Sequence, residues 1–197
     1  MKSFFFAVVL MLLLPPINAG KFDGVSLGAS IGGNIASLKQ RSVTDGFKQL
    51  GANGKLYAGI GKSFLDVIFV GVEAFGRYSL FVKSEDANKG SVDAAPQFGG
   101  YLKTGIRPSE NLLLYGIYGI QTSSAKIKNA VENFFEPTDG TWSTIIGAGF
   151  EYAIGVGAAV RVEGIYEPDT SFKIKDIPNL SYDVNFFSLS LGIVVYL

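Results

Sequence analysis

Seven charged residues lie within otherwise apolar, alternating segments of this chain, where they could do chemistry together. They are Glu73, Arg77, Lys103, Arg107, Glu151, Arg161 and Glu163. Successive side chains of a strand point to opposite faces of a sheet, so these residues share one face with the small and polar residues of their segments. Charges on an inner face could form a proton path, an ion site or a gate. The alternative is a network of ion pairs that fills a narrow interior.

The composition removes most catalytic chemistry. The chain has no histidine, which excludes serine–histidine triads, histidine-bound zinc and histidine general bases. The sequence Gly61-Lys62-Ser63 matches the end of a phosphate-binding loop, but the first glycine of that motif would fall at Leu56. We therefore expect no enzymatic activity, no cofactor and no metal.

The last thirteen residues, 185–197, are the clearest structural element, because they carry no charge and alternate strictly. One face is apolar: Phe187, Leu189, Leu191, Ile193, Val195 and Leu197. The other face is mostly small or polar: Ser188, Ser190, Gly192, Val194 and Tyr196. A soluble protein rarely ends on a long exposed apolar strand, whereas a membrane barrel pairs its last strand with its first and turns the apolar face to lipid.

The same alternation predicts eight strands. Their ranges are 23–36, 55–64, 69–82, 95–107, 112–122, 141–154, 158–167 and 185–197. In the fifth, 112–122, both stripes are apolar, so the pattern does not decide which of them faces inward.

The connections between these strands alternate in length. Three are short, at 65–68, 108–111 and 155–157. Four are long and polar, at 37–54, 83–94, 123–140 and 168–182. Short periplasmic turns and long extracellular loops are typical of transmembrane barrels. The sequence therefore predicts an all-β fold, an eight-stranded antiparallel up-and-down transmembrane β-barrel.

The short connection 155–157 also predicts one pair of lumen charges. If it is a three-residue turn, Ile154 faces Ala158, and Glu151 lies directly across from Arg161. Opposed residues share one face of a sheet. Both are the polar members of their stripes, so we expect an ion pair inside the barrel.

The amino-terminal residues predict export. Lys2 precedes an apolar stretch over residues 4–14, and Ala19 offers a small residue for cleavage. We expect a signal peptide over residues 1–19 and a single barrel domain over 20–197. After cleavage 16 basic and 17 acidic residues remain, a balance that argues against nucleic acid as a partner. The chain has no cysteine, so it cannot form disulfides.

With these features the chain resembles the small eight-stranded outer-membrane barrels of the OmpA-transmembrane-domain, OmpX/Ail and opacity-protein type. Its carboxyl end is similar to the assembly signal of that family, a polar residue, a glycine, a hydrophobic residue and a final aromatic residue at fixed spacing. The matching positions are Ser190, Gly192, Val195 and Leu197, with leucine in place of the aromatic residue. The resemblance implies the outer membrane of a Gram-negative bacterium, contact with lipid and lipopolysaccharide, and recognition by the barrel assembly machinery.

Function is then expected in the loops, where binding residues concentrate. Candidate contacts are Lys39, Arg41, Lys126, Lys128, Phe134 and Phe135. The first hypothesis is a non-catalytic surface barrel whose loops adhere to a host surface or matrix, or shield the cell. The second is a small pore for ions or a hydrophobic molecule. A third, a soluble lipocalin-like binder, lacks the tryptophan expected in its first strand, because the only tryptophan is Trp142.

Overall fold

The computed structural model describes residues 21–40, 47–81, 91–94, 96–123, 125–128, 135–137, 141–173 and 181–197. The predicted signal peptide therefore lies outside the described residues. Eleven strands are present in these ranges. They are β1 (Gly24–Gln40), β2 (Phe47–Phe64), β3 (Ile68–Phe81), β4 (Ser91–Ala94), β5 (Gln97–Ser109), β6 (Leu112–Ser123), β7 (Ala125–Lys128), β8 (Phe135–Pro137), β9 (Thr141–Gly155), β10 (Ala158–Lys173) and β11 (Ser181–Tyr196). No helix in these ranges is long and apolar enough to cross a membrane.

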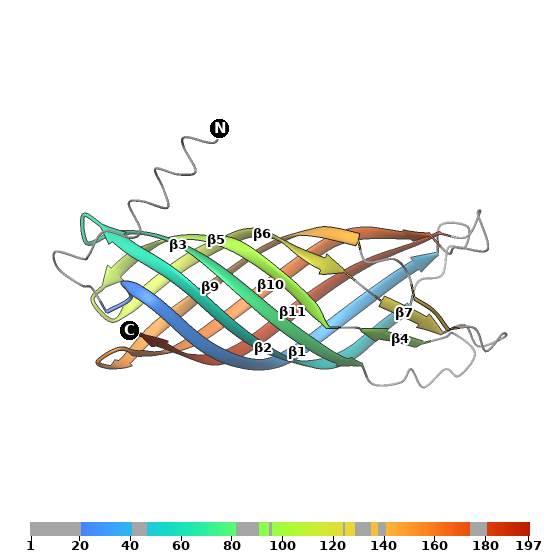
Figure 1. Cartoon of the computed structure of the whole chain (residues 1–197), viewed down its shortest axis with the longest axis horizontal. Helices are drawn as coiled ribbons and strands as arrows, with labels where there is room; N and C mark the ends of the chain where they lie inside the picture. The colour runs from blue at the N-terminus through green and yellow to red at the C-terminus, as the bar shows by residue number, and fades with distance from the viewer. Residues whose placement is uncertain are drawn as a thin grey trace.

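Eight of the strands close into a single antiparallel barrel, in the order β1-β11-β10-β9-β6-β5-β3-β2 (Figure 1). The first and last strands meet along a continuous ladder from Ser26↔Tyr196 to Gln40↔Tyr182. The predicted fold class and closure are confirmed. The remaining strands form a small separate sheet in the order β4-β7-β8, at the end of the barrel away from the carboxyl terminus.

Alternation decides which side chains fill the barrel. On β11, Phe187, Leu189, Leu191, Ile193 and Val195 are exposed on the outer wall, whereas Ser188, Ser190, Gly192 and Val194 point into the lumen. On β6 the facing left open by the sequence is resolved: Leu113, Tyr115, Ile117 and Gln121 are buried, and Leu114, Tyr118 and Ile120 are exposed. The outer stripe of β6 is apolar because it faces lipid. Its inner stripe is also mostly apolar because these aromatic and aliphatic side chains fill part of the lumen.

Two of the four long connections are shorter than the sequence predicted. β1 continues to Gln40 and β2 begins at Phe47, so most of the expected loop 37–54 is strand. The expected loop 168–182 is likewise shortened, because β10 runs to Lys173 and β11 begins at Ser181. The prediction was wrong because it read the loss of apolar character as the end of a strand, although ladder pairs such as Lys39↔Asp183 continue there.

The short turns all lie at the end where the chain leaves the barrel at its carboxyl terminus (Figure 1). In the turn between β2 and β3, Val67 N donates to Phe64 O at 3.2 Å, and Leu65 and Asp66 both have positive φ. This is the hairpin conformation whose twist matches that of the flanking strands. The turn between β9 and β10 is Val156-Gly157, one residue shorter than expected, and Gly157 has a φ of 73°.

Candidate functional site: the charge network of the lumen

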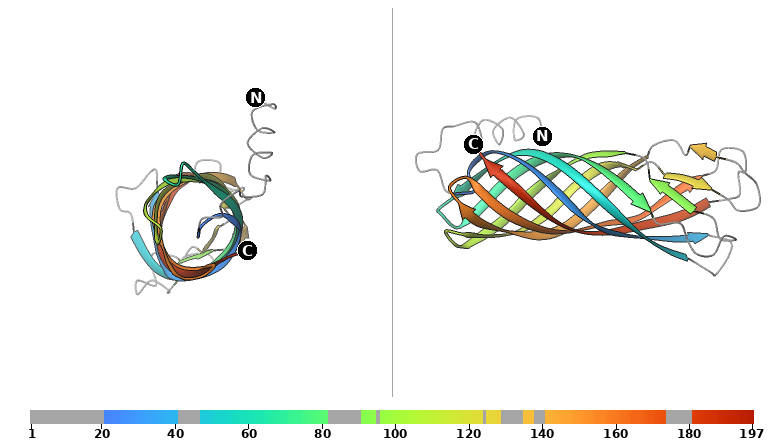
Figure 2. Two further views of the ribbon diagram at one scale, coloured as in Figure 1. Left: turned by 90° about the vertical axis from the view of Figure 1, so that its left-hand side faces the viewer. Right: turned by 90° about the horizontal axis from the view of Figure 1, so that it is seen from below.

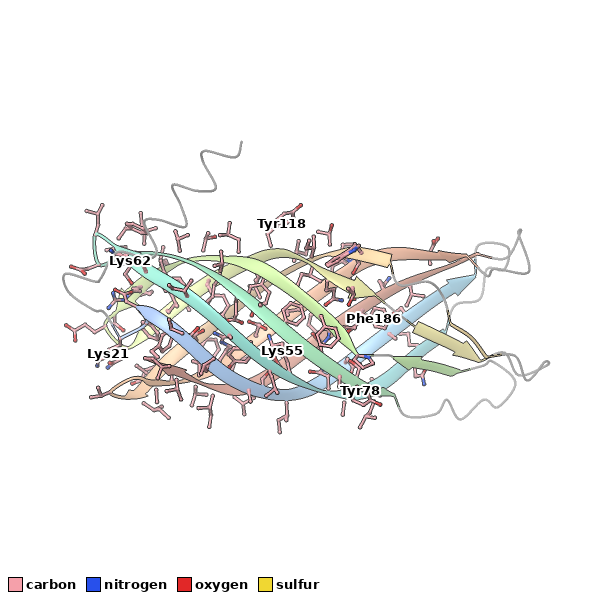
Figure 3. All side chains as sticks on the ribbon, in the orientation of Figure 1. Lys21, Lys55, Lys62, Tyr78, Tyr118 and Phe186 are labelled. Carbon is pink, nitrogen blue, oxygen red and sulfur yellow. The ribbon has the colours of Figure 1, made fainter. Side chains whose placement is uncertain are left out.

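Six charged side chains meet in the middle of the barrel, and we call them the central network. They are Lys55, Glu73, Lys103, Glu151, Arg161 and Glu163. They come from β2, β3, β5, β9 and β10, and each occupies an inward position of its strand. Figure 3 shows Lys55 among the side chains that fill the barrel, whereas Tyr118 lies on the outer wall.

Arg161 is the centre of this network. Its Nη1 and Nη2 donate to the two carboxylate oxygens of Glu73 at 2.7 and 2.8 Å. Its Nε donates to Glu151 Oε1 at 2.8 Å, and Nη2 lies 2.7 Å from the same oxygen. The guanidinium also stacks 4.0 Å from the ring centre of Tyr57. The planar fork of arginine suits this bidentate pairing, which a lysine could not reproduce.

Two lysines complete the charge balance. Lys103 pairs with Glu151, and Lys55 pairs with Glu163. Three cations therefore face three carboxylates. Because a buried charge is tolerated only when it is paired, this balance accounts for six ionised groups in an interior without open solvent.

Tyrosines supply the remaining hydrogen bonds and enclose the ammonium groups. Tyr101 donates to Glu73, and Tyr196 donates to Glu151. Tyr115 lies 3.3 Å from Glu163 Oε2, and its ring centre is 4.3 Å from Lys103 Nζ. A cation over an aromatic face is stabilised by the ring quadrupole, more so when both are desolvated. The inner aromatic rings therefore both fill space and stabilise charge.

A second cluster surrounds Arg77. Arg77 Nε donates to Gln97 Oε1 at 2.8 Å, Nη2 donates to Gln121 Oε1 at 3.2 Å, and Nη2 lies 3.8 Å from Glu167 Oε2. Glu167 also accepts from Gln121, and from Ser143 at 2.6 Å. Glu73 and Arg77 thus each pair with a residue of another strand, Glu73 with Arg161 and Arg77 with Glu167.

Arg107 stands apart from both clusters, although the sequence grouped it with them. It is only half-buried, and its guanidinium lies 5.8 Å from the ring centre of Phe22. Its Nε and Nη1 have no hydrogen-bond partner among the described residues. Its inward position was predicted from alternation, but alternation says nothing about the height of a residue along the barrel.

The register of β9 and β10 pairs Glu151 directly with Arg161, as predicted. The expected pairing of Ile154 with Ala158 is wrong. Ala158 pairs with Gly155, and a register shift between Ala158 and Ala159 restores the predicted alignment from Ala159↔Ala153 onward. The bulge compensates for the shorter turn, so the charged pair is unaffected.

Sequence reasoning missed Lys55 and Glu167 as members of the clusters. Lys55 shares the inward stripe of Tyr57, and Glu167 shares that of Glu163. Both stand at predicted strand ends, 55–64 and 158–167, where a charge is ordinarily solvated. A prediction with the longer strands that the structure shows would have placed both residues inside the barrel.

The other predicted site residues are distributed over both walls and the small sheet. Ser190 and Gly192 face the lumen, while Val195 and Leu197 are exposed on the outer wall. Lys39 lies in β1, Lys126 and Lys128 in β7, and Phe135 in β8, so these four are strand residues and not loop residues as expected. Arg41 and Phe134 lie outside the described residues.

The sequence matches the family described as outer membrane protein beta-barrel domain over residues 4–194. The chain belongs to this family. Membership places the protein in the outer membrane of Gram-negative bacteria, while cleavage of residues 1–19 stays a prediction.

Solved structures of this architecture resemble the barrel. Neisserial surface protein A matches with a TM-score of 0.59 at 12% identity, over 89% of this chain and 100% of that chain. Ail of Yersinia pestis matches with a TM-score of 0.44 at 19% identity, over 87% of this chain and 99% of that chain. OprG of Pseudomonas aeruginosa matches with a TM-score of 0.44 at 14% identity, over 90% of this chain and 99% of that chain. No curated protein sequence matches the chain. At these identities the structural likeness shows the fold and not the function.

Proposed function

We propose that this protein is a non-catalytic surface barrel that does not conduct, and that it acts through its extracellular end by adhesion or by shielding the cell. The observation that carries the proposal is the filling of the lumen. Arg161, Glu151 and Glu163 are at most 1% exposed and bridge β3, β9 and β10 across the interior. An eight-stranded barrel is just wide enough for its own side chains to fill.

The extracellular end offers the surface for such a role. The small sheet β4-β7-β8 stands beyond the barrel at the end opposite the short turns (Figure 1). Its strand β7 carries Lys126 and Lys128, and Arg41 lies in the connection between β1 and β2. Basic residues attract anionic partners over a Debye length of about 8 Å at physiological salt. We therefore propose an anionic host surface, matrix component or lipopolysaccharide as the partner.

Purified barrel reconstituted in a planar bilayer should give no steady ion conductance. The paired charges of the central network cannot separate to admit an ion without leaving buried charges unpaired. The alternative function, a small pore, requires stepwise conductance that scales with protein and salt. Such steps, recorded reproducibly with the wild-type chain, would contradict a closed lumen.

Replacing Arg41, Lys126 and Lys128 together with serine should reduce the binding of expressing cells to an anionic surface. We expect a loss that shrinks as salt is raised, because the attraction is screened. Binding of whole cells to immobilised heparin-like polysaccharide, or to lipopolysaccharide, measures it. Lys62→Ser is the matched control, since Lys62 lies at the opposite end of β2. Equal binding by the triple variant and the control at every salt concentration would leave shielding as the remaining role.

A further inference from the structure

Residues 21–23, which we call the plug, fold back into one mouth of the barrel. Figure 2 shows the start of the described chain, in blue, curving inside the ring of strands when the barrel is viewed from its short-turn end. Phe22 is completely buried, although it precedes β1 and belongs to no strand. By contrast, Leu65 and Val156, which are apolar residues in the short turns at the same end of the barrel, are 88% and 104% exposed.

The ring of Phe22 packs against the side chains of Tyr196 and Arg107. It meets the ring of Tyr196 edge-on, with centroids 5.9 Å apart and planes at 86°. The guanidinium of Arg107 lies 5.8 Å from its centre. Edge-to-face contact is the favoured geometry for two aromatic rings, and a guanidinium prefers a ring face. Arg107 thus acquires a partner from the plug that neither lumen cluster provides.

Side-chain hydrogen bonds hold the plug in place, not a strand ladder. Asp23 Oδ1 accepts from Ser63 N at 2.8 Å and from Ser63 Oγ at 2.7 Å. Lys21 Nζ donates to Asn111 Oδ1 at 2.5 Å, in the turn between β5 and β6. The chain enters β1 through Gly24, whose φ is 103°. That conformation favours glycine, and a Cβ there would lie 2.6 Å from Leu197 O.

A small cavity lies beside Tyr196, the residue whose ring Phe22 contacts. It measures about 10 Å³, and its polar lining comes from Ser26, Glu73, Lys103 and Tyr196. A space of this size holds about one water molecule. The inward glycines Gly61 and Gly71 lie opposite each other in its lining, where a Cβ on either would meet the ring of Phe69. Glu73 and Lys103 of the central network thus line the cavity on one side, and Tyr196, which contacts Phe22, lines it on another.

We propose that the plug is a hinged closure of the lumen: by turning about Gly24 it admits water and small ions from the periplasm as far as Glu73 and Lys103. The periplasmic side follows from the short turns at this mouth. The central network stays closed during this movement, so the closure controls access to half of the lumen and not passage through it. This inference goes beyond the proposed surface role and does not depend on the extracellular partner.

The cysteine-free sequence allows a direct test with a single reporter thiol. Ser26→Cys places the thiol in the lining of this cavity, at a site that is 6% exposed. The folded barrel in detergent is treated with a small cationic methanethiosulfonate, and the rate of modification is measured. Phe22→Ala should raise this rate about tenfold or more, because the local opening that exposes the thiol no longer has to displace the ring. Asp23→Ala keeps the ring but removes the bonds to Ser63, and it should give a smaller increase.

Two controls keep the test specific. Phe64→Ala truncates an exposed aromatic residue at the same end and should leave the rate unchanged. Ser188→Cys reports on the lumen beyond the central network and should react equally slowly with and without Phe22. Heat-modifiable mobility shows which variants fold, and Asp23→Ala answers the question if Phe22→Ala does not fold. The proposal is overturned if the plug variants react no faster than Phe64→Ala, or if Ser188→Cys accelerates as much as Ser26→Cys.

Discussion

Arg161→Ala should destabilise the folded barrel by about 3–5 kcal/mol, the usual cost of removing one partner from a buried charge pair. The change leaves Glu73 and Glu151 without their shared guanidinium, and both carboxylates are at most 5% exposed. A wet lumen would reduce this cost, but Arg161 itself has no exposed surface. Equilibrium unfolding in detergent with urea measures the loss. Val162→Ala, the next residue on the outer wall, should cost clearly less because it strands no charge.

A double-mutant cycle separates the pair from general packing. The double change Glu151→Gln with Arg161→Gln should cost less stability than the two single changes added together, because the second change removes the charge that the first left unpaired. Additive losses would show that the two side chains do not interact. A second cycle with Glu73→Gln should also be non-additive, since Glu73 accepts two bonds from the same guanidinium.

The facing of most lumen residues could be predicted from the sequence, because alternation is a local property of a strand. The pairing of Glu151 with Arg161 was also predictable, since the two strands are joined by a short turn and their register follows from it. The bulge at Ala158 was not, yet it restores the same alignment. When a tight turn joins two neighbouring strands, the sequence is therefore enough to predict which of their residues lie opposite each other.

The contact of Arg161 with Glu73 could not be predicted in the same way. It joins β10 to β3, which are not neighbours in the barrel, so no register connects them. Such a contact depends on barrel diameter and strand tilt, which alternation does not reveal. The plug was missed for a related reason. Phe22 lies outside every periodic segment, and its burial comes from closure of the barrel around it.

Deleting residues 195–197 should keep the chain in the periplasm. The deletion removes the end of the ladder that joins β11 to β1, where Val195 pairs with Leu27 and Leu197 N donates to Val25 O at 2.8 Å. It also removes Tyr196, which donates to Glu151 and supports Phe22. The backbone groups at the start of β1 then lose their partners on β11, and an unsatisfied backbone group in the membrane costs several kcal/mol. Membrane fractionation measures the outcome.

Point variants distinguish the loss of closure from the loss of a recognised terminus. Leu197→Phe should insert at normal or higher levels, because Leu197 is 75% exposed on the outer wall and a ring fits there without displacing a neighbour. Tyr196→Ala should insert but unfold more easily, since it removes lumen contacts and keeps the ladder. A truncated chain that reached the outer membrane at wild-type levels, with heat-modifiable mobility, would show that residues 195–197 serve neither closure nor assembly. If Tyr196→Ala were retained in the periplasm as completely as the truncation, the lumen contact of Tyr196 would be the requirement, and not the terminal pattern of Ser190, Gly192, Val195 and Leu197.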